Sequence, residues 1–329
     1  MPRPRLAWVL LMVVVSACST RGDAPPGAPP HKVRVAFSPY VSWGPLIIAQ
    51  SEGYFRNEGL EIEFVSALHS EESLVALITG DLDVRPGPLS AGFLSAVSQG
   101  ARIRIVAGMG YLARDGCPYF GIILRRGIDT VGVPAIKRMR TSQDGYTRFL
   151  VSRMLAQRGV QLEDIETLRL PAPVMVSSLQ SGAVDAIAAS EPTLSRVAGA
   201  GQRWVTAQES SPDFQWGVIA FGERFLSREP DLGVRFLRAY RRGLAQYALG
   251  KTARNVTIIA QATGETPQAT GDACWPAFQS DARPNWGSIA TFQSWARAEG
   301  LLDQAVSESA VWDSSFVMAS DRAAEPRKR

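Results

Sequence analysis

The stretches "SLVALITGDLDV" (residues 73–84) and "MVSSLQSGAVDAI" (175–187) decide the fold, because they share one pattern. Each has an apolar helical segment that ends at a glycine, then two residues, an aspartate and an apolar strand. A glycine directly after a helix is typical of a helix C-cap. Two copies are too few for a solenoid, so the repeat predicts two related α/β lobes.

Alternating and helical segments follow one another around both copies. Strands are predicted at residues 32–38, 60–66, 82–86, 102–108, 119–126, 130–134, 165–171, 184–190, 202–208 and 216–222. Helices are predicted at 45–55, 71–80, 88–100, 143–157, 172–182, 230–249, 253–262, 267–278 and 286–299. Strands separated by single helices predict a mostly parallel sheet that is covered by helices.

The N-terminus has the features of an export signal. An apolar run of 12 residues, Leu6–Ala17, follows Arg3 and Arg5. A span of the hydrocarbon core needs about 20 apolar residues, so this run predicts a signal peptide over 1–17 rather than a membrane helix. Residues 18–31 hold four prolines and two glycines and predict a tether.

Charge and cysteine content limit the function and the compartment. The 329 residues carry a formal net charge of +4, which falls to +2 once the signal peptide is removed, and no long Lys/Arg run occurs. These features argue against nucleic-acid binding and leave 321–329 as a solvated basic tail. Besides Cys18, the chain holds Cys117 and Cys274. They form either one disulfide or two separate buried thiols.

Several longer motifs resemble a known family. "GPLIIAQSEGYFRNEGLEIEFV" (44–65), "ALITGDLDV" (76–84), "LQSGAVDAIAASEP" (179–192) and "VWDSSF" (311–316) resemble the periplasmic substrate-binding proteins of ABC importers. The closest branch binds nitrate, alkanesulfonates, taurine and the thiamine pyrimidine precursor. The resemblance implies a type II binding-protein fold with a ligand cleft between two lobes. Lobe one would take residues 32–120 and 220–320, and lobe two residues 121–219.

The same resemblance extends to the end of the signal peptide. Val15-Ser16-Ala17-Cys18 is similar to the lipobox of bacterial lipoproteins. In that family the cysteine becomes the first mature residue and carries lipid. We therefore expect a monomer on the outer side of a bacterial membrane, attached through the lipid on Cys18 alone. Its partners would be a small-molecule ligand and an ABC permease with its ATPase.

Candidate ligand-binding residues in lobe one follow the ends of predicted strands, where ligands bind in open parallel sheets. They are Ser38, Tyr40, Ser42, Trp43, Arg85, Ser90 and Tyr111. The aromatic rings would stack on a planar ligand, and Arg85 would attract a carboxylate, sulfonate or phosphate. Two alternatives stay open: Trp43 fills the lobe core, or Arg85 forms an ion pair with Asp83.

Candidates in lobe two and at the second crossing complete the predicted site. They are Thr141, Ser142, Tyr146, Glu191 and Trp216. Ser142 is expected to cap a helix that points into the cleft, and Glu191 would bind a cation or an amine. Tyr146 is either a cleft or a core residue. The cations Lys137, Arg138 and Arg140 are predicted to lie in a solvated loop.

An enzyme is the weaker interpretation. The chain has only His31 and His69 as histidines, and no HExxH, CxxC, GxSxG or phosphate-loop motif. A pyrimidine-synthesis enzyme of related fold needs a cysteine-rich run that this chain lacks. We expect neither cofactor nor metal. The sequence predicts capture of a small anionic and aromatic solute or a sulfonate for import. Presentation of the ligand to a sensor, or a larger hydrophobic ligand, are the alternatives.

Overall fold

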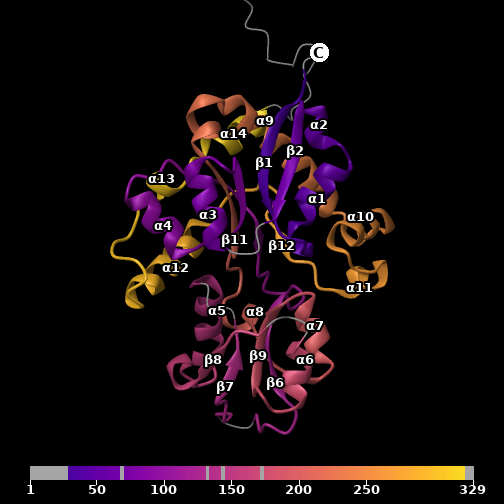
Figure 1. Ribbon diagram of the computed structural model, residues 1–329, viewed down its shortest axis with the longest axis vertical. Helices are drawn as coiled ribbons and strands as arrows, with labels where there is room; N and C mark the ends of the chain where they lie inside the picture. The colour runs from indigo at the N-terminus through magenta and orange to yellow at the C-terminus, as the bar shows by residue number, and fades with distance from the viewer. Residues whose placement is uncertain (1–28, 67–69, 131–132, 142–144, 171–173, 323–329) are drawn as a thin grey trace, which may run out of the picture.

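Two five-stranded sheets form the cores of two lobes, which lie one above the other along the long axis of the molecule (Figure 1). The structure is a computed structural model that describes residues 29–66, 70–130, 133–141, 145–170 and 174–322. The predicted signal peptide, most of the tether with Cys18, and Ser142 lie outside these residues. The predicted α/β class with two helix-flanked sheets is confirmed.

The sheet of lobe one has the strand order β2-β1-β3-β11-β4. The strands are β1 (His31–Phe37), β2 (Leu60–Ser66), β3 (Val84–Pro88), β4 (Arg104–Gly108) and β11 (Gly217–Phe221). β1 is parallel to β2 and β3, whereas β11 is antiparallel to β3 and β4. The chain thus returns to the first sheet at Gly217, close to the return expected at residue 220.

The sheet of lobe two repeats this arrangement. Its order is β8-β7-β9-β6-β10, when it is read in the matching direction. The strands are β6 (Phe120–Arg125), β7 (Arg138–Arg140), β8 (Glu166–Leu168), β9 (Ala186–Ser190) and β10 (Gly201–Thr206). β7 is parallel to β8 and β9, and β6 is antiparallel to β9 and β10. The sequence repeat therefore corresponds to a repeat of topology.

Helices cover both sheets, and the C-terminal part of the chain adds a helical layer to lobe one (Figure 1). Lobe one contains η1 (Val41–Trp43), α1 (Gly44–Ser51), α2 (Tyr54–Asn57), α3 (Ser70–Thr79) and α4 (Ala91–Ser98). Lobe two contains α5 (Gly145–Ala156), η2 (Leu162–Asp164), α6 (Met175–Gln180), α7 (Thr193–Ala198) and α8 (Ala207–Ser210). The C-terminal layer contains η4 (Arg224–Arg228), α9 (Pro230–Tyr247), α10 (Ala253–Thr263), α11 (Pro267–Asp272), α12 (Trp286–Ala298), α13 (Glu308–Val311) and α14 (Ser315–Arg322). None of the helices described is both long and apolar enough to cross a bilayer.

Helix α9 binds the C-terminal layer to lobe one by crossing α1 at close range. A Cβ atom at Gly243 would overlap the carbonyl oxygen of Pro45, and one at Gly44 would overlap the ring of Tyr247. Gly243 is therefore required by the close approach of two backbones, and Gly44 leaves room for the ring of Tyr247.

The aspartate of each repeated motif fastens its helix–strand unit to the neighbouring strand. Asp83 accepts a hydrogen bond from the backbone N–H of Arg34 at 2.8 Å and lies 3.3 Å from the Arg224 guanidinium. Arg34 in turn donates to the carbonyl of Gly80, which ends α3 with a φ of 84°. The motif thus connects three segments through one buried carboxylate.

Lobe two uses the same device with different residues. Asp185 accepts from the backbone N–H groups of Lys137 and Arg138 at 3.0 and 3.1 Å, and pairs with Arg125 at 3.3 Å. Arg138 donates to the carbonyl of Gly182 at 2.9 Å, as Arg34 does to Gly80.

Four predicted helices or strands are wrong in part. The strand expected at 130–134 is displaced to β7, because Pro134 has no N–H to pair and Asp185 holds the start of the next segment. Residues 131–132 of that prediction lie outside the described residues. The helix expected at 45–55 breaks at Gly53, which is left-handed with a φ of 72°.

The helix expected at 267–278 ends at Asp272. The chain then forms β12 (Ala277–Phe278), which pairs with β5 (Gly110–Tyr111). The helix expected from 88 begins only at Ala91, since β3 continues to Pro88. Arg138 and Arg140 belong to β7 rather than to a loop, whereas Lys137 precedes the strand and, like Arg138, is exposed as predicted.

Candidate functional site

Tyr119 lies at the junction of the two lobes. It ends the first crossing between the lobes, its carbonyl accepts from the backbone N–H of Glu191 of lobe two at 3.0 Å, and its phenol lies near the hydroxyls of Ser42 of lobe one and Ser190 of lobe two. Burial raises the pKa of Tyr119 far above its usual value, and the two serine hydroxyls oppose this only in part. The phenol is therefore neutral at ordinary pH.

Aromatic rings from both crossings surround this hydroxyl. Trp216, at the end of the second crossing, stacks on Tyr119 with ring centroids 5.7 Å apart. Tyr40 is near enough to the Tyr119 phenol to influence its pKa, and its ring centroid lies 6.2 Å from that of Trp43. Tyr40 is 44% exposed, so it offers a free ring face beside the junction.

Trp43 belongs to the core of lobe one, which was one of its two alternatives. It is only 7% exposed, yet its indole N–H has no hydrogen-bond partner among the described residues. The same holds for the indole N–H of Trp216, which is 4% exposed. A buried donor without an acceptor costs about 1–3 kcal/mol, so these two N–H groups are available for an oxygen-bearing ligand.

Both tryptophans lie near the end of β3. The six-membered ring of Trp43 lies 3.9 Å from the Cβ position of Gly87. Trp216 directly precedes β11, whose first residues Gly217 and Val218 pair with Pro88 and Gly87.

Arg85 does not pair with Asp83, so that alternative is wrong. Asp83 is held by Arg224, whereas the Arg85 side chain reaches Ser73 of α3. Its Nε donates to Ser73 Oγ at 3.0 Å, and both terminal nitrogens lie 3.3 Å from the carbonyl oxygen of Pro88.

The Arg85 guanidinium is 1% exposed. Burial lowers the pKa of Arg85 to about 10, and the carboxylate of Glu71 opposes this shift. The side chain therefore stays charged at neutral pH inside lobe one.

Several predicted residues have structural partners of their own. Ser90 caps α4 by accepting from the backbone N–H of Phe93 at 3.1 Å. Glu191 accepts from the N–H and the hydroxyl of Ser195 at 3.2 and 2.7 Å. Tyr146 is buried and its ring lies 6.1 Å from that of Phe214.

The structure brings only part of the predicted set together. Ser42, Tyr40, Glu191 and Trp216 surround Tyr119. The other predicted residues lie elsewhere or have no described contact with Tyr119. They are Ser38, Trp43, Arg85, Ser90, Tyr111, Thr141 and Tyr146. Sequence reasoning missed Tyr119 and Ser190, although both stand at strand ends that border the lobe junction.

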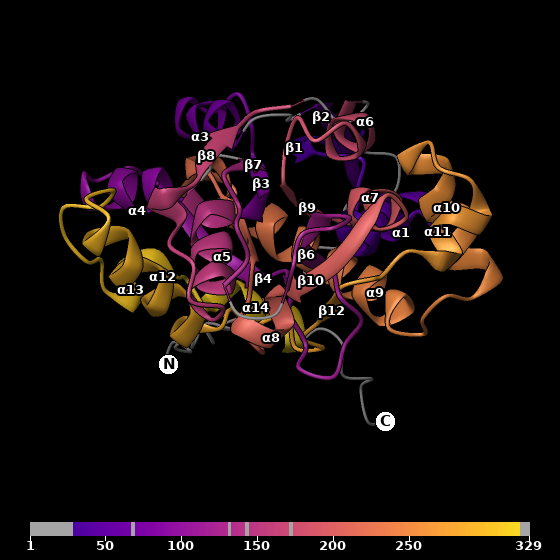
Figure 2. The same cartoon turned by 90° about the horizontal axis from the view of Figure 1, so that it is seen from below.

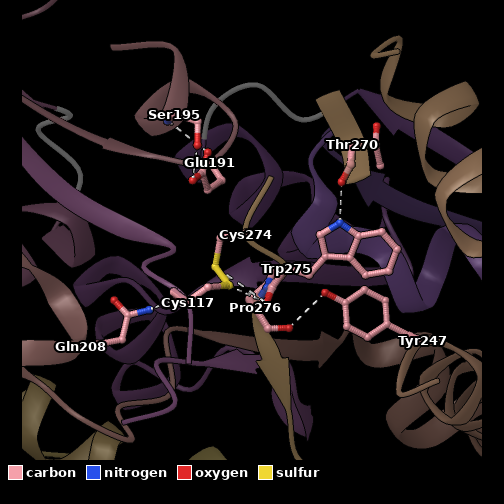
Figure 3. Close-up of a disulfide and its surroundings, with 9 residues drawn as sticks. All are labelled: Cys117, Glu191, Ser195, Gln208, Tyr247, Thr270, Cys274, Trp275 and Pro276. Carbon is pink, nitrogen blue, oxygen red and sulfur yellow. Dashed lines mark hydrogen bonds between the residues drawn. A yellow bond between two sulfur atoms is a disulfide. The ribbon is translucent and has the colours of Figure 1, made fainter. Parts of the chain in front are cut away.

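Cys117 and Cys274 form a disulfide beside this junction, so the alternative of two separate thiols is wrong (Figure 3). Their Cα atoms are 5.6 Å apart, and the bond joins the first crossing to the segment that follows α11. The carbonyl of Cys117 also accepts from Gln208 Nε2 of lobe two at 2.6 Å. Next to Cys274, Trp275 stacks on Tyr247 at 5.1 Å.

Comparison with known proteins gives one family match and many structural matches. The model of the NMT1-like family matches residues 26–262. No curated protein matches the chain.

Three solved structures illustrate the similarity of fold. The alkanesulfonate-binding protein SsuA from Xanthomonas axonopodis, bound to MOPS, is 18% identical with a TM-score of 0.66, over 87% of this chain and 99% of that one. The nitrate-binding protein NrtA from Synechocystis is 16% identical with a TM-score of 0.68, over 90% and 89%. The desulfurization enzyme DSZB is 15% identical with a TM-score of 0.67, over 90% and 100%.

Proposed function

We propose that this chain, which belongs to the NMT1-like family, is a solute-binding protein. It captures a small organic acid and delivers it to an ABC permease. The bound solute would lie between the lobes. The observation that carries this proposal is Tyr119 of the first crossing, whose ring stacks on Trp216 of the second crossing and whose carbonyl accepts from the Glu191 N–H of lobe two. A solute that enters beside Tyr119 changes the contact between the lobes, which couples binding to closure.

A comparison of the two lobes supports an acidic solute. Aligning Gly80 with Gly182 places Arg85 opposite Ile187 and Ser73 opposite Met175. Ile187 and Met175 are members of one apolar cluster in lobe two. Lobe one thus holds a buried cation and a hydroxyl where its counterpart uses two hydrocarbon side chains. Burying a cation at this position costs desolvation free energy. The fold does not need a cation there, because lobe two has hydrocarbon side chains at the same positions.

The proposed solute combines a flat apolar part with an acidic group. Tyr40, Trp43 and Trp216 supply ring faces and two indole donors. Arg85 supplies positive charge behind the strand end at Pro88. An aromatic or heteroaromatic acid, or a sulfonate, would satisfy both. The alkanesulfonate and the nitrate named for two structural neighbours share with this solute only the negative charge.

A thermal-shift screen tests the proposed class. The probes are benzoate, benzenesulfonate, nicotinate, taurine and nitrate, with neutral benzamide as the matched control. A solute at 100 times its dissociation constant stabilises the protein by about 2.7 kcal/mol, so at least one acid should raise the melting temperature while benzamide does not. Equal shifts with benzamide, or conversion of the acid to a product, would contradict the proposal.

Attachment through lipid on Cys18 is a separate part of the proposal. It is supported by the short apolar run and by Val15-Ser16-Ala17-Cys18. Intact-mass analysis of the membrane fraction should give a chain that begins at Cys18 and carries a diacylglyceryl group. Cys18→Ser should release the protein from the membrane fraction. A wild-type chain that is cut elsewhere and recovered as free protein would contradict it.

A further inference from the structure

The C-terminal layer of lobe one contacts lobe two at two places of different chemistry. Figures 1 and 2 show α5 beside α12 on one side of the molecule, and α7 near α11 on the other. The first contact is aromatic and the second is ionic. Because the chain crosses between the lobes only twice, these contacts constrain how lobe two can move.

The aromatic contact joins α5 to α12. The Phe149 ring lies 5.8 Å from that of Phe292 and 5.4 Å from that of Trp295, both edge-on. Phe149 and Phe292 are almost completely buried. Separating these rings would expose apolar surface to water, so this contact resists opening. Arg148 and Glu299 form an ion pair 3.2 Å long at the same place.

The ionic contact joins α7 to the turn between α10 and α11. Arg196 donates from its guanidinium to the carboxylate of Glu265. Their side chains are 53% and 27% exposed. Water can solvate both groups as soon as they separate, so this contact breaks at low cost.

The segment that carries Glu265 and Cys274 (residues 264–285, here the arm) is held to the first crossing and to lobe one. The disulfide to Cys117 fixes the arm to the first crossing (Figure 3). The hydroxyl of Tyr247 on α9 donates to the carbonyl of Pro276 at 3.0 Å. Relative motion on this side must therefore occur between Arg196 and Glu265.

We propose that the α5–α12 contact is the pivot of lobe opening and that the Arg196–Glu265 pair is a latch that favours the closed arrangement. The disulfide keeps the latch residue of lobe one in place. The latch acts before any solute binds and does not depend on which solute the protein takes.

Distance measurements on the solute-free full chain test the latch. Spin labels at Val133 of lobe two and Leu249 of lobe one occupy exposed positions, and the native disulfide stays intact. Arg196→Glu at low ionic strength should raise the fraction of the long-distance population about two- to fivefold, the range of an exposed ion pair. The double variant Arg196→Glu/Glu265→Arg should restore the wild-type distribution. Salt at 1 M should bring wild type toward Arg196→Glu.

The matched control reverses a charge at the pivot. Glu299→Arg removes the Arg148–Glu299 pair but leaves the aromatic contact, so it should not change the long-distance fraction. Circular dichroism and a melting temperature near that of wild type establish that each variant is folded. An unchanged distribution in Arg196→Glu, or equal opening in Glu299→Arg, would overturn the proposal.

Discussion

The two lobes share one anchor and differ in what lies beside it. In both, an aspartate accepts from backbone N–H groups at a parallel strand, β1 in lobe one and β7 in lobe two. An arginine of that strand donates to the glycine carbonyl at the end of the helix that precedes the aspartate. Two residues after the aspartate, lobe one has a buried arginine where lobe two has an isoleucine. The anchor therefore belongs to the fold, and the difference indicates what is specific to lobe one.

A second difference concerns the C-terminal part of the chain. Lobe two ends with β10 and α8, whereas lobe one receives β11, α9 and the helices that follow. The disulfide between Cys117 and Cys274 joins this C-terminal part to the first crossing. Four expected outcomes follow from these differences, from the largest effect on stability to the smallest.

Removing the disulfide should have the largest effect, and it should act on lobe one. Cys117→Ala/Cys274→Ala is expected to lower the free energy of unfolding by about 2–5 kcal/mol, because the bond closes a loop with a sequence separation of 157 residues. Urea unfolding measures the loss. Hydrogen exchange should increase in residues 109–119 and in the arm more than in β7 to β9. Uniform exchange across both lobes would contradict the assignment to lobe one.

Removing the two anchors tests whether they are equivalent. Asp83→Ala should cost about 3 kcal/mol, because Asp83 is only 2% exposed and its loss leaves the backbone N–H of Arg34 without its acceptor, while Arg224 keeps its pair with Glu229. Asp185→Ala should cost less, since the Asp185 side chain is 13% exposed and its partner Arg125 is 38% exposed. Chemical denaturation gives both values. A larger loss in Asp185→Ala would show that burial does not set the difference.

Transplanting the apolar pair of lobe two into lobe one separates stability from binding. The double variant Arg85→Ile/Ser73→Met should be as stable as wild type or more stable by about 1–3 kcal/mol, as for other buried charges replaced by hydrocarbon. Its affinity for the acid found in the screen should fall at least tenfold. Arg85→Lys is the control that keeps the charge. A destabilised double variant that binds normally would make Arg85 a purely structural residue.

The smallest effect is the pH dependence that Asp185 contributes. Burial alone would raise the pKa of Asp185, but the backbone N–H groups of Arg138 and Lys137 and the Arg125 guanidinium hold it below its usual value. The unfolded pKa is about 3.9, so this contribution is present above that pH and is lost as the pH falls through the lower folded pKa. The stability difference between wild type and Asp185→Asn should therefore shrink between pH 6 and pH 3. A constant difference would contradict this sign.

The repeat and the class of fold could be read from the sequence because they rest on local patterns. Alternating strands, a glycine and an aspartate at fixed spacing occur within a dozen residues, and the structure confirms two matching sheets. The positions of β6 and β11 do not follow the order of the chain, because β11 lies between β3 and β4 and β6 lies between β9 and β10. This arrangement depends on pairing across long stretches of chain, which periodicity does not encode.

The site was less predictable for the same reason. Tyr40, Ser42, Glu191 and Trp216 could be named from the sequence, since each stands at a strand end or crossing, and their contact with a solute stays a prediction. Tyr119 was missed because it reads as the first residue of an apolar strand. The partners of Arg85 could not be inferred either, because Ser73 lies on a different element and Arg224 takes the nearby carboxylate.

The position of β11 has a consequence for how the chain folds as it is made. Lobe two is one continuous segment, and its strands β6 to β10 are all available once residue 206 has been synthesised. Lobe one, whose first strand begins at His31, still lacks β11, the partner of both β3 and β4, and α9, which covers α1. The half that is synthesised first is thus completed last. The N-terminal strands stay without their full sheet until about residue 247 has been added, which keeps that half of the chain open to unfolding for most of its synthesis.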